Sequence, residues 1–320
     1  MSEEFAITGD DVFSARERIA TKTIVTPCVY SEALSKRLGF DLYFKAENLQ
    51  HIGAFKARGA LNAVLQLTED EASRGVVTHS SGNHAAALAR AARVRGIVAH
   101  VVMPENSAQT KIEAVRGLGV EPVFCKPGSD SREQTAAEIQ QSTGAVLIHP
   151  FEDPRVMAGQ GTVGLEIVEQ VPDVDTVIAP VGGGGLMSGV LTAMHTVKPK
   201  ADVYCAEPEW ADDTYRSFRS GKIEDVQRID TVADGLRTRV GESTWPIIRH
   251  HAKDVLVASE SEILTAMRTI IERVKLVAEP SGAVAFACLC RNAEKFQGQR
   301  VVVVITGGNV DMSTCRAGQP

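Results

Sequence analysis

Lys56 lies in a segment, residues 53–60 (GAFKARGA), that combines an amine with small and aromatic neighbours. A lysine that is removed from water has a lowered pKa, and its neutral amine can form an imine with a carbonyl group. A lysine at the start of a helix is more often an ordinary surface side chain. The segment is therefore a weak indication of covalent chemistry when it is taken alone.

A polar segment, residues 79–84 (HSSGNH), directly follows one expected strand and precedes an expected helix. Serine and asparagine are common helix caps, but one cap needs only one such residue. Here several polar residues and a glycine stand together. Hydroxyls and free main-chain N–H groups at a helix N-terminus bind anions, so this segment predicts a carboxylate site.

Four consecutive glycines, Gly182, Gly183, Gly184 and Gly185, lie between another expected strand and a helix that starts near Leu186. A flexible linker would also be rich in glycine, but a linker would not be wedged between a buried strand and a helix. Bare N–H groups at a helix N-terminus indicate a phosphate site. The loop matches neither the Walker pattern nor a dinucleotide fingerprint with its acidic residue.

Two more expected strands end in residues that could bind a ligand. Thr306 follows the β-branched run 301–305 and would place a neutral hydroxyl at the mouth of a crevice, although a simple turn has the same sequence. Glu207 and Asp213 follow the run 203–206. With an intervening carbonyl they would supply the oxygen ligands of a hard cation, but solvated or capping carboxylates look the same.

The elements that must position these residues alternate along the chain. Strands are expected at 76–79, 98–103, 122–125, 146–149, 176–180, 203–206 and 301–305, and helices at 85–93, 108–117, 131–141, 163–170 and 187–195. This pattern predicts an α/β fold with two parallel-sheet-based lobes. We expect residues 75–150 to form a small mobile domain, and residues 1–74 with 151–320 a large one. Ligands bind such folds at the carboxyl ends of the strands, where the candidate segments lie.

Composition excludes several classes of function. The net charge of −6 argues against a nucleic-acid partner. No apolar run approaches the ~18 residues of a membrane span, and the acidic N-terminus does not look like a signal peptide. The six cysteines lack zinc-site spacing, so we expect buried, reduced thiols and a cytoplasmic protein.

The segments GAFKARGA, SSGNHAAAL, PVGGGGLMSG, AEPEWADD, TVADGLR, AEPSGA and ITGGNVD occur in this order. Together they resemble the serine racemase and serine/threonine dehydratase family of pyridoxal phosphate (PLP) enzymes, which have fold type II, similar to the tryptophan synthase β chain. The resemblance runs from about residue 19 to about residue 311. Seven ordered motifs are far more specific than any one of them. The resemblance implies a PLP cleft between the two lobes.

The resemblance also implies catalytic and binding roles. Lys56 would carry PLP as a Schiff base and take the α-proton on one face, and Ser81 would be the second base that racemisation requires on the other face. The remaining implied roles are substrate-carboxylate binding by Ser80, Ser81, Gly82, Asn83 and His84, contact of Asn83 with the phenolic oxygen, phosphate binding by Gly182 to Gly185 and Leu186, and placement of Thr306 at the pyridine nitrogen with Glu279 nearby. Glu207, the carbonyl of Ala211 and Asp213 match the family's position for Mg²⁺, Ca²⁺ or Mn²⁺.

The implied reaction is elimination of water from L-serine or L-threonine, which gives a 2-oxo acid and ammonia, together with serine racemisation. A neutral hydroxyl at the pyridine nitrogen makes the ring a weaker electron sink, which suits β-elimination better than transamination. A small amino-acid substrate and a homodimer are expected.

Some positions depart from animal serine racemases. Ala85 and Ala86 replace a Gly-Gln pair that helps to bind ATP, so nucleotide activation is not implied, and Phe151 is more typical of dehydratases. Arg132 matches an arginine of the racemases that reaches the active site, and Arg237 is a second candidate cation. Both could instead form surface ion pairs.

Three alternatives to a serine or threonine dehydratase remain open. Arg132 and Arg237 together would favour a second substrate carboxylate, which leaves a 3-hydroxyaspartate ammonia-lyase giving oxaloacetate as the alternative within the class. An NAD-dependent oxidoreductase would explain the glycines but leave Lys56 and the 79–84 segment without a role. A non-catalytic amino-acid sensor on the same fold is the third alternative.

Overall fold

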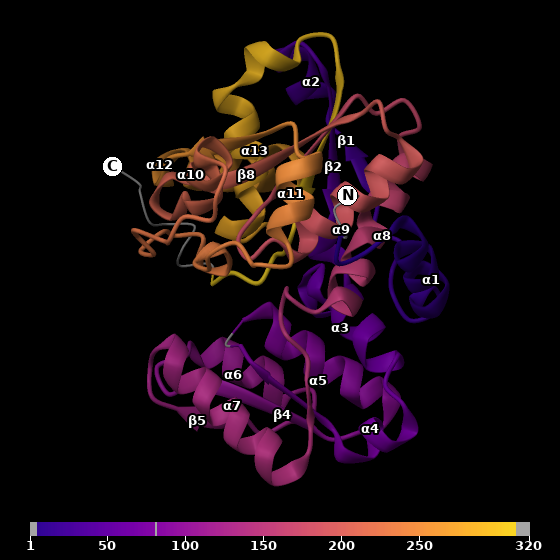
Figure 1. Cartoon of the computed structure of the whole chain (residues 1–320). Helices are drawn as coiled ribbons and strands as arrows, with labels where there is room; N and C mark the ends of the chain where they lie inside the picture. Colours follow the sequence, from indigo (N-terminus) through magenta and orange to yellow (C-terminus); the bar gives the residue numbers. More distant parts are fainter. Residues whose placement is uncertain (1–4, 81, 312–320) are drawn as a thin grey trace.

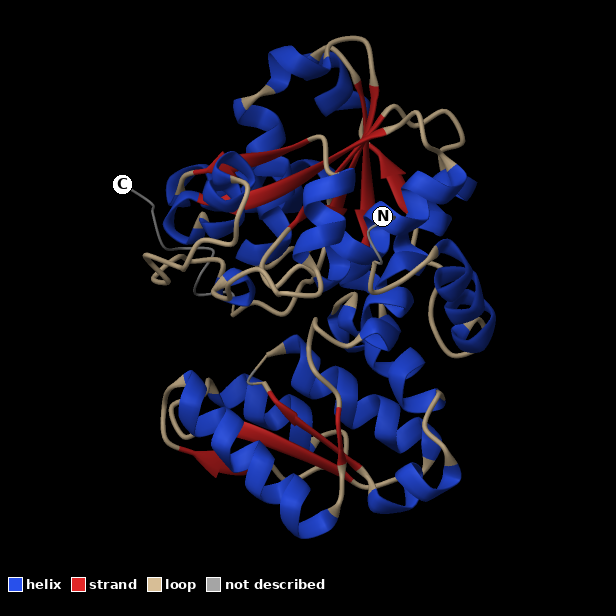
Figure 2. Ribbon diagram, viewed as in Figure 1, coloured by secondary structure: helices blue, strands red, loops and turns tan. Residues whose placement is uncertain are grey.

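A computed structural model describes residues 5–80 and 82–311 of the chain (Figure 1). Two separate sheets organise it, one in the upper part of the view and one in the lower part (Figure 2). Both are built mainly from parallel strands, as the alternating pattern predicts, so the predicted α/β class is confirmed. The division of the chain into two domains at residues 75 and 150 stays a prediction.

The larger sheet joins the two halves of the sequence. Its strands, in spatial order, are β1 (Cys28–Tyr30), β2 (Asp41–Ala46), β10 (Arg300–Ile305), β7 (Thr176–Pro180), β8 (Asp202–Pro208) and β9 (Asp254–Ala258). The last strand, β10, pairs in parallel with β2 on one side and with β7 on the other. Only β1 runs antiparallel to its neighbour among the strands described. The C-terminal strand therefore lies inside the sheet, as expected for its purely β-branched sequence.

Helices cover both faces of this sheet. Alternate residues of β10 point to opposite faces, so Val302 and Val304 join one core and Val301 and Val303 join the other. The first core includes residues of α1 (Gly9–Ile19), α8 (Pro154–Gln170), α9 (Gly185–Val197) and α11 (Trp245–His251). The second includes residues of α2 (Glu32–Leu38), α12 (Glu260–Thr269) and α13 (Pro280–Arg291). The remaining helix of this region, α10, spans Asp213–Ser220.

The smaller sheet has the order β5 (Val123–Cys125), β4 (Ala99–Pro104), β3 (Val76–His79) and β6 (Val146–Leu147). Its helices are α5 (Asn83–Arg95), α6 (Gln109–Arg116) and α7 (Ser129–Thr143). Two preceding helices, α3 (Lys56–Leu65) and α4 (Glu69–Arg74), share a hydrophobic cluster with α5. Short 3₁₀ turns span Glu47–Leu49, His51–Gly53, Glu209–Ala211, Asp234–Leu236 and Ala293–Phe296, and a π-helical turn spans Ile270–Val274.

The expected elements from residue 75 onward are present, with changes at their ends. The helix expected at 163–170 begins earlier, at Pro154, because Asp153 caps it and proline is well suited to the first helical position. The strand expected at 146–149 is shorter and ends at Leu147, so that His149 lies beyond it.

The cysteine prediction is partly wrong. Cys125, Cys205 and Cys288 are buried free thiols, but Cys290 is exposed and Cys28 is half-buried. Cys315 lies outside the described residues. Within residues 5–80 and 82–311, no helix combines the length and the apolar character that crossing a membrane would require.

Candidate active site

Lys56 is the first residue of α3, and the chain leading into it is tied to the end of β10. The N–H of Phe55 donates to the carbonyl of Thr306 at 3.0 Å. The Lys56 Nζ donates to the carbonyl of Pro150 at 2.8 Å. Burial lowers the pKa of Lys56 to about 8, so a much larger share of its amine is neutral near physiological pH than in an exposed lysine. This is the state in which a lysine acts as a nucleophile.

His149 lies close enough to this amine for the two charges to interact, and it was not predicted as a site residue. His149 follows β6, and its Nδ1 accepts a hydrogen bond from the Glu152 N–H at 2.9 Å. Its ring contacts those of Phe151 and His79, with centroids 4.7 Å and 5.5 Å away. Burial, aided by His79, lowers the pKa of His149 to about 4, so the imidazole is neutral. The available signal was position, because His79 ends β3 and His149 closely follows β6, the neighbouring strand of the same sheet.

The four glycines form a buried loop between β7 and α9 that has no room for side chains. A Cβ on Gly183 would lie 2.3 Å from the Phe151 ring, and one on Gly184 would lie 2.6 Å from the Thr244 hydroxyl. Gly184 also has a φ of +90°, which glycine adopts without strain. The loop therefore keeps a bare backbone at the N-terminus of α9, where N–H groups lack helical partners. Its geometry suits an anion such as phosphate.

Thr306, Glu279 and Asn83 come together from three distant parts of the sequence. Thr306 and Glu279 are buried, and the Glu279 N–H donates to the carbonyl of Gly307 at 3.0 Å. The Asn83 amide donates to Glu279 Oε1 at 2.8 Å. Burial, and then the nearby charge of Asp234, raises the pKa of Glu279 to about 8, so its carboxyl group is mostly protonated at neutral pH.

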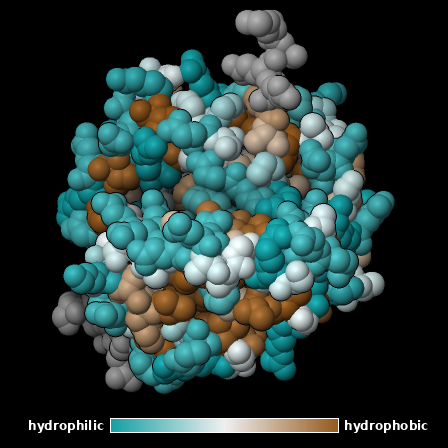
Figure 3. Space-filling view, turned by 60° about the horizontal axis from the view of Figure 1, so that its bottom comes forward, coloured by the Kyte–Doolittle hydropathy of each residue, from teal (hydrophilic) through white to brown (hydrophobic). Residues whose placement is uncertain are grey.

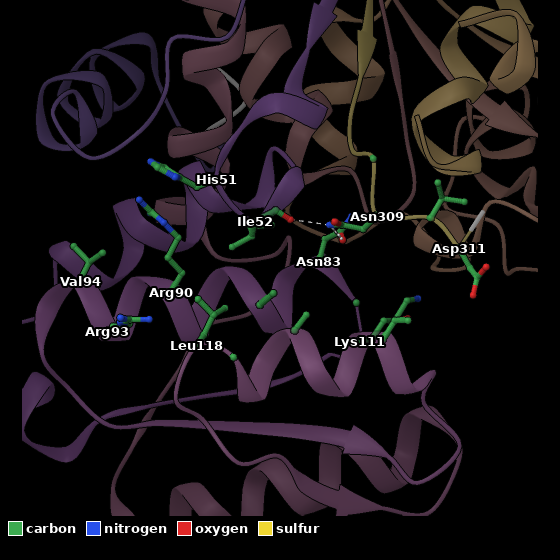
Figure 4. Close-up of a pocket in the computed structure, with 17 residues that line it drawn as sticks. His51, Ile52, Asn83, Arg90, Arg93, Val94, Lys111, Leu118, Asn309 and Asp311 are labelled. Carbon is green, nitrogen blue, oxygen red and sulfur yellow. Dashed lines mark hydrogen bonds between the residues drawn. The ribbon is translucent and has the colours of Figure 1, made fainter. Parts of the chain in front are cut away.

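Asn309 was not predicted as a site residue. It lies between Asn83 and a cavity whose lining includes both residues (Figure 4). Its amide donates to Asn83 Oδ1 at 2.8 Å and to the carbonyl of Ile52 at 2.7 Å. The cavity has a volume of about 910 Å³ and lies between α5, α6 and residues 308–311. Arg90 and Lys111 are among its lining residues, and so is Ala86, one of the two alanines that depart from the racemase pattern.

The segment predicted to bind a carboxylate, residues 79–84, runs from the end of β3 into the first two residues of α5. The Gly82 N–H approaches Ser80 Oγ at 3.4 Å, and a side chain at Gly82 would meet open space. His84 is buried, and its Nε2 lies 3.0 Å from the carbonyl of Ile148. Its Nδ1 has no hydrogen-bond partner among the described residues. Ser81 lies outside the described residues, so its predicted role as the second base stays a prediction.

The two candidate cations differ in their surroundings. Arg132 is half-buried on the first turn of α7, where its Nε donates to the Gly128 carbonyl at 3.3 Å. Its charge adds to the effect of burial in lowering the pKa of His79, the last residue of β3. Arg237 donates through Nε and Nη2 to the carbonyl of Thr231, at 3.1 Å and 2.6 Å.

The predicted cation ligands lie between the end of β8, which contains Glu207, and the start of α10, whose first residue is Asp213. Both Glu207 carboxylate oxygens accept main-chain N–H bonds, from Thr214 at 3.0 Å and Tyr215 at 2.8 Å. Asp213 Oδ2 accepts from the Val240 N–H at 2.8 Å, whereas its buried Oδ1 has no partner among the described residues. Burial raises the pKa of both carboxyl groups. The described part of the chain has no cluster of three or more His, Cys, Asp or Glu side chains suited to a metal.

Comparison with known proteins agrees with this geometry. The family described as "Pyridoxal-phosphate dependent enzyme" matches residues 19–307. A β-hydroxyaspartate dehydratase of Paracoccus denitrificans is 47% identical, over 95% of this chain and 97% of the relative. The structure of maize serine racemase superposes with a TM-score of 0.95 at 42% identity, covering 97% of this chain and 96% of that one. A threonine deaminase from T.th. has a TM-score of 0.91 at 41% identity, covering 95% and 99%. The chain therefore belongs to the family of pyridoxal-phosphate dependent enzymes.

Proposed function

We propose that this enzyme eliminates water from L-serine or L-threonine, giving a 2-oxo acid and ammonia, and that it also racemises serine. The observation that carries the proposal is the buried Lys56 amine of lowered pKa, which donates to the carbonyl of Pro150, directly before the Phe151 that packs against the glycine loop. Full-length similarity to a serine racemase and a threonine deaminase supports the same reaction class.

The residues of the site fit PLP. Gly182 to Gly185, with Leu186 on the first turn of α9, would hold the phosphate through main-chain N–H groups. Lys56 would be the attachment point for the aldehyde carbon. Asn83 would contact the phenolic oxygen, and Thr306 would face the pyridine nitrogen with Glu279 beside it. Residues 80–84 would hold the substrate carboxylate at the N-terminus of α5.

PLP supplies an electron sink for the negative charge that develops at the α-carbon of a bound amino acid. The Lys56 amine, kept largely neutral by burial, would take the α-proton on one face. Ser81 would exchange a proton on the opposite face, which racemisation requires.

Two neutral groups, Thr306 and Glu279, would lie near the pyridine ring of PLP, and they favour elimination over transamination. Thr306 offers a hydroxyl, which cannot hold a proton on the pyridine nitrogen as a carboxylate would. Glu279 does not restore that carboxylate, because its raised pKa of about 8 keeps it mostly protonated at neutral pH. A weaker electron sink is sufficient when the charge at the α-carbon is discharged at once by loss of the β-hydroxyl.

A 3-hydroxyaspartate ammonia-lyase is the second candidate, and a specific observation favours it. The relative that is 47% identical over 95% of this chain is a β-hydroxyaspartate dehydratase. Arg132, whose charge lowers the pKa of His79, is the candidate partner for a second substrate carboxylate. The product would then be oxaloacetate in place of pyruvate or 2-oxobutyrate.

Steady-state kinetics with three substrates would test both candidates. The purified enzyme is expected to show the visible absorbance of covalently bound PLP, which borohydride removes. L-Serine, L-threonine and 3-hydroxyaspartate are then compared by kcat/KM from the release of 2-oxo acid. A clear preference for 3-hydroxyaspartate would replace the first candidate by the second. A colourless protein that binds NADH, or one that releases no 2-oxo acid, would contradict the proposal.

Ser81→Ala is expected to abolish racemisation while L-serine elimination remains measurable. The reason is that L-substrates need only Lys56 to remove their α-proton, whereas inversion needs a second base on the other face. The measurement is interconversion of L- and D-serine by chiral chromatography, with pyruvate release assayed in the same samples. Continued interconversion of the two enantiomers would show that another group is the second base.

A divalent cation, Mg²⁺, Ca²⁺ or Mn²⁺, is proposed to bind Glu207, the carbonyl of Ala211 and Asp213. The unpartnered, buried Asp213 Oδ1 supports this, because a hard cation would satisfy that oxygen and offset the repulsion between two buried carboxylates. EDTA is expected to lower the melting temperature, and Mg²⁺ should restore it. Asp213→Asn should lose the response to EDTA. Asp212→Asn, which removes a carboxylate paired with Arg216, should keep it.

A homodimer and a cytoplasmic location are also proposed. Hydrophobic residues gather in the lower half of the face shown in Figure 3, and the exposed large apolar side chains of the chain include Val25, Leu49 and Val98. A second copy of the chain would cover such surface. Sedimentation or light scattering would establish the oligomeric state.

A further inference from the structure

Glu152 lies where the chain passes from β6 to α8, and it makes contacts that none of the proposed roles uses. Its Oε1 accepts from the Glu242 N–H at 2.7 Å, and its Oε2 accepts from the Ser243 N–H at 2.9 Å. The preceding residue, Phe151, packs against two of the loop glycines, Gly183 and Gly185. The connection between the sheets therefore touches both the glycine loop and residues 241–244, which we call the support loop.

The support loop is shaped around the Glu152 carboxylate. A Cβ on Gly241 would lie 2.1 Å from Glu152 Oε1, which is far inside van der Waals contact, so any side chain there would displace the carboxylate. The N–H of Gly241 donates to the Thr244 hydroxyl at 3.0 Å. The carboxylate thus accepts hydrogen bonds from two consecutive N–H groups in the middle of the loop, and the Thr244 hydroxyl bonds the first residue of the loop. Charge-assisted bonds of this kind are stronger than bonds between neutral groups.

The support loop in turn holds the glycine loop by a main-chain carbonyl. The Thr244 hydroxyl donates to the carbonyl of Gly183 at 2.8 Å, and the Gly241 N–H reaches the same carbonyl at 3.2 Å. The peptide that follows Gly183 is trans, so its C=O and the N–H of Gly184 point in opposite directions. Because the carbonyl faces the support loop, the Gly184 N–H must face away from it.

We propose that Glu152 is a positioning residue for the cofactor phosphate: it fixes the support loop, which fixes the Gly183–Gly184 peptide with its N–H directed at the phosphate. The proposal rests on the proposed role of the glycine loop as the phosphate site. It does not depend on which amino acid is the substrate. Removing the hydrogen-bond partners that orient metal ligands changes metal affinity by about 10- to 100-fold, and we expect an effect of similar order here.

The test compares PLP with pyridoxal, which has the same aldehyde but no phosphate. Dissociation constants for both are measured on the apoenzyme by visible absorbance, for the wild type and for Glu152→Gln. Glutamine keeps the size of the side chain but replaces one accepting oxygen by an NH₂ group, which cannot accept a bond from an N–H. PLP affinity is expected to fall on the order of 10-fold, whereas pyridoxal affinity stays unchanged within error.

Two further variants make the outcome decisive. Thr244→Val removes the hydroxyl at the other end of the same connection and should shift the ratio of the two affinities in the same direction. Glu169→Gln neutralises an exposed glutamate of α8 that pairs with Arg16, and it should leave both affinities unchanged. Circular dichroism of each apoenzyme shows whether it is folded. If Glu152→Gln is unfolded, the comparison of PLP with pyridoxal is made with Thr244→Val.

The possible failures can be told apart. If the wild type binds PLP and pyridoxal equally well, the glycine loop is not the phosphate site. If the wild type prefers PLP and both variants keep that preference in full, the loop assignment stands and the positioning role of Glu152 is wrong. If Glu152→Gln weakens both compounds equally, Glu152 acts on the site as a whole and the inference fails.

Discussion

Lys56→Ala is expected to reduce turnover on the order of 10⁴-fold or more, because one side chain serves both as the cofactor attachment point and as the base for the α-proton. The variant should also lose the visible absorbance of covalently bound PLP. The structure gives the physical reason: burial lowers the pKa of this amine to about 8, which makes it a nucleophile and a base near neutral pH. The measurement is release of 2-oxo acid, with the absorbance spectrum recorded on the same preparation.

The matched control is Lys36→Ala, which removes an exposed lysine of α2. It should keep the spectrum and the turnover. In the wild-type apoenzyme, the rate at which PLP attaches covalently should rise with pH up to about pH 8, because the neutral amine is the reacting form. A Lys56→Ala variant that still eliminates water from its substrate would overturn the assignment of Lys56.

Arg58→Met is expected to lower the free energy of unfolding by about 3–5 kcal/mol, because it leaves buried carboxylates without their main partner. Arg58 is fully buried two residues after Lys56, and it donates to Glu47 Oε2 at 2.8 Å and to Glu166 Oε2 at 2.8 Å. Burial by itself raises the pKa of Glu47, but the charge of Arg58 and its hydrogen bonds outweigh this and lower the pKa below its usual value. Lys45 would remain as the one described cation in contact with Glu166.

Urea unfolding followed by circular dichroism measures this change. The control is Arg16→Met, the same substitution in an exposed ion pair with Glu169. It should cost no more than about 1 kcal/mol, because water screens both charges before and after the change. Similar losses for the two variants would show that the buried network does not stabilise the fold. The network also anchors α3, so Arg58→Met should weaken PLP binding through displacement of Lys56.

Much of the framework could be predicted from local patterns. The alternation of apolar runs with helix-length segments predicted parallel sheets, since strands buried on both faces are uniformly apolar. The glycines after β7 and the polar residues after β3 were recognisable because each interrupts a regular pattern at a strand end. Elements before residue 75, such as β2, were not predicted. The sequence 41–46 mixes charged and apolar residues, and the buried Lys45 is paired there with Glu166 and with the carbonyl of Thr26, neither of which is near it in the sequence.

The chemistry of individual side chains was decided by tertiary structure. Nothing near Glu279 in the sequence indicates a protonated carboxyl group, and its raised pKa comes from burial and from Asp234, which is distant in the chain. His149 and Glu152 were missed for the same reason, because their partners lie on other elements.

The sequence by itself determined which residue types stand at the strand ends, and hence the family and its cofactor. Only the folded chain decided which of them meet and in what protonation state, because desolvation and charge–charge interactions depend on distances in space and not on spacing along the chain. Lys56 shows the difference most clearly. Its identity as a candidate was readable from GAFKARGA, but the lowered pKa that makes it reactive is a property of the packed site.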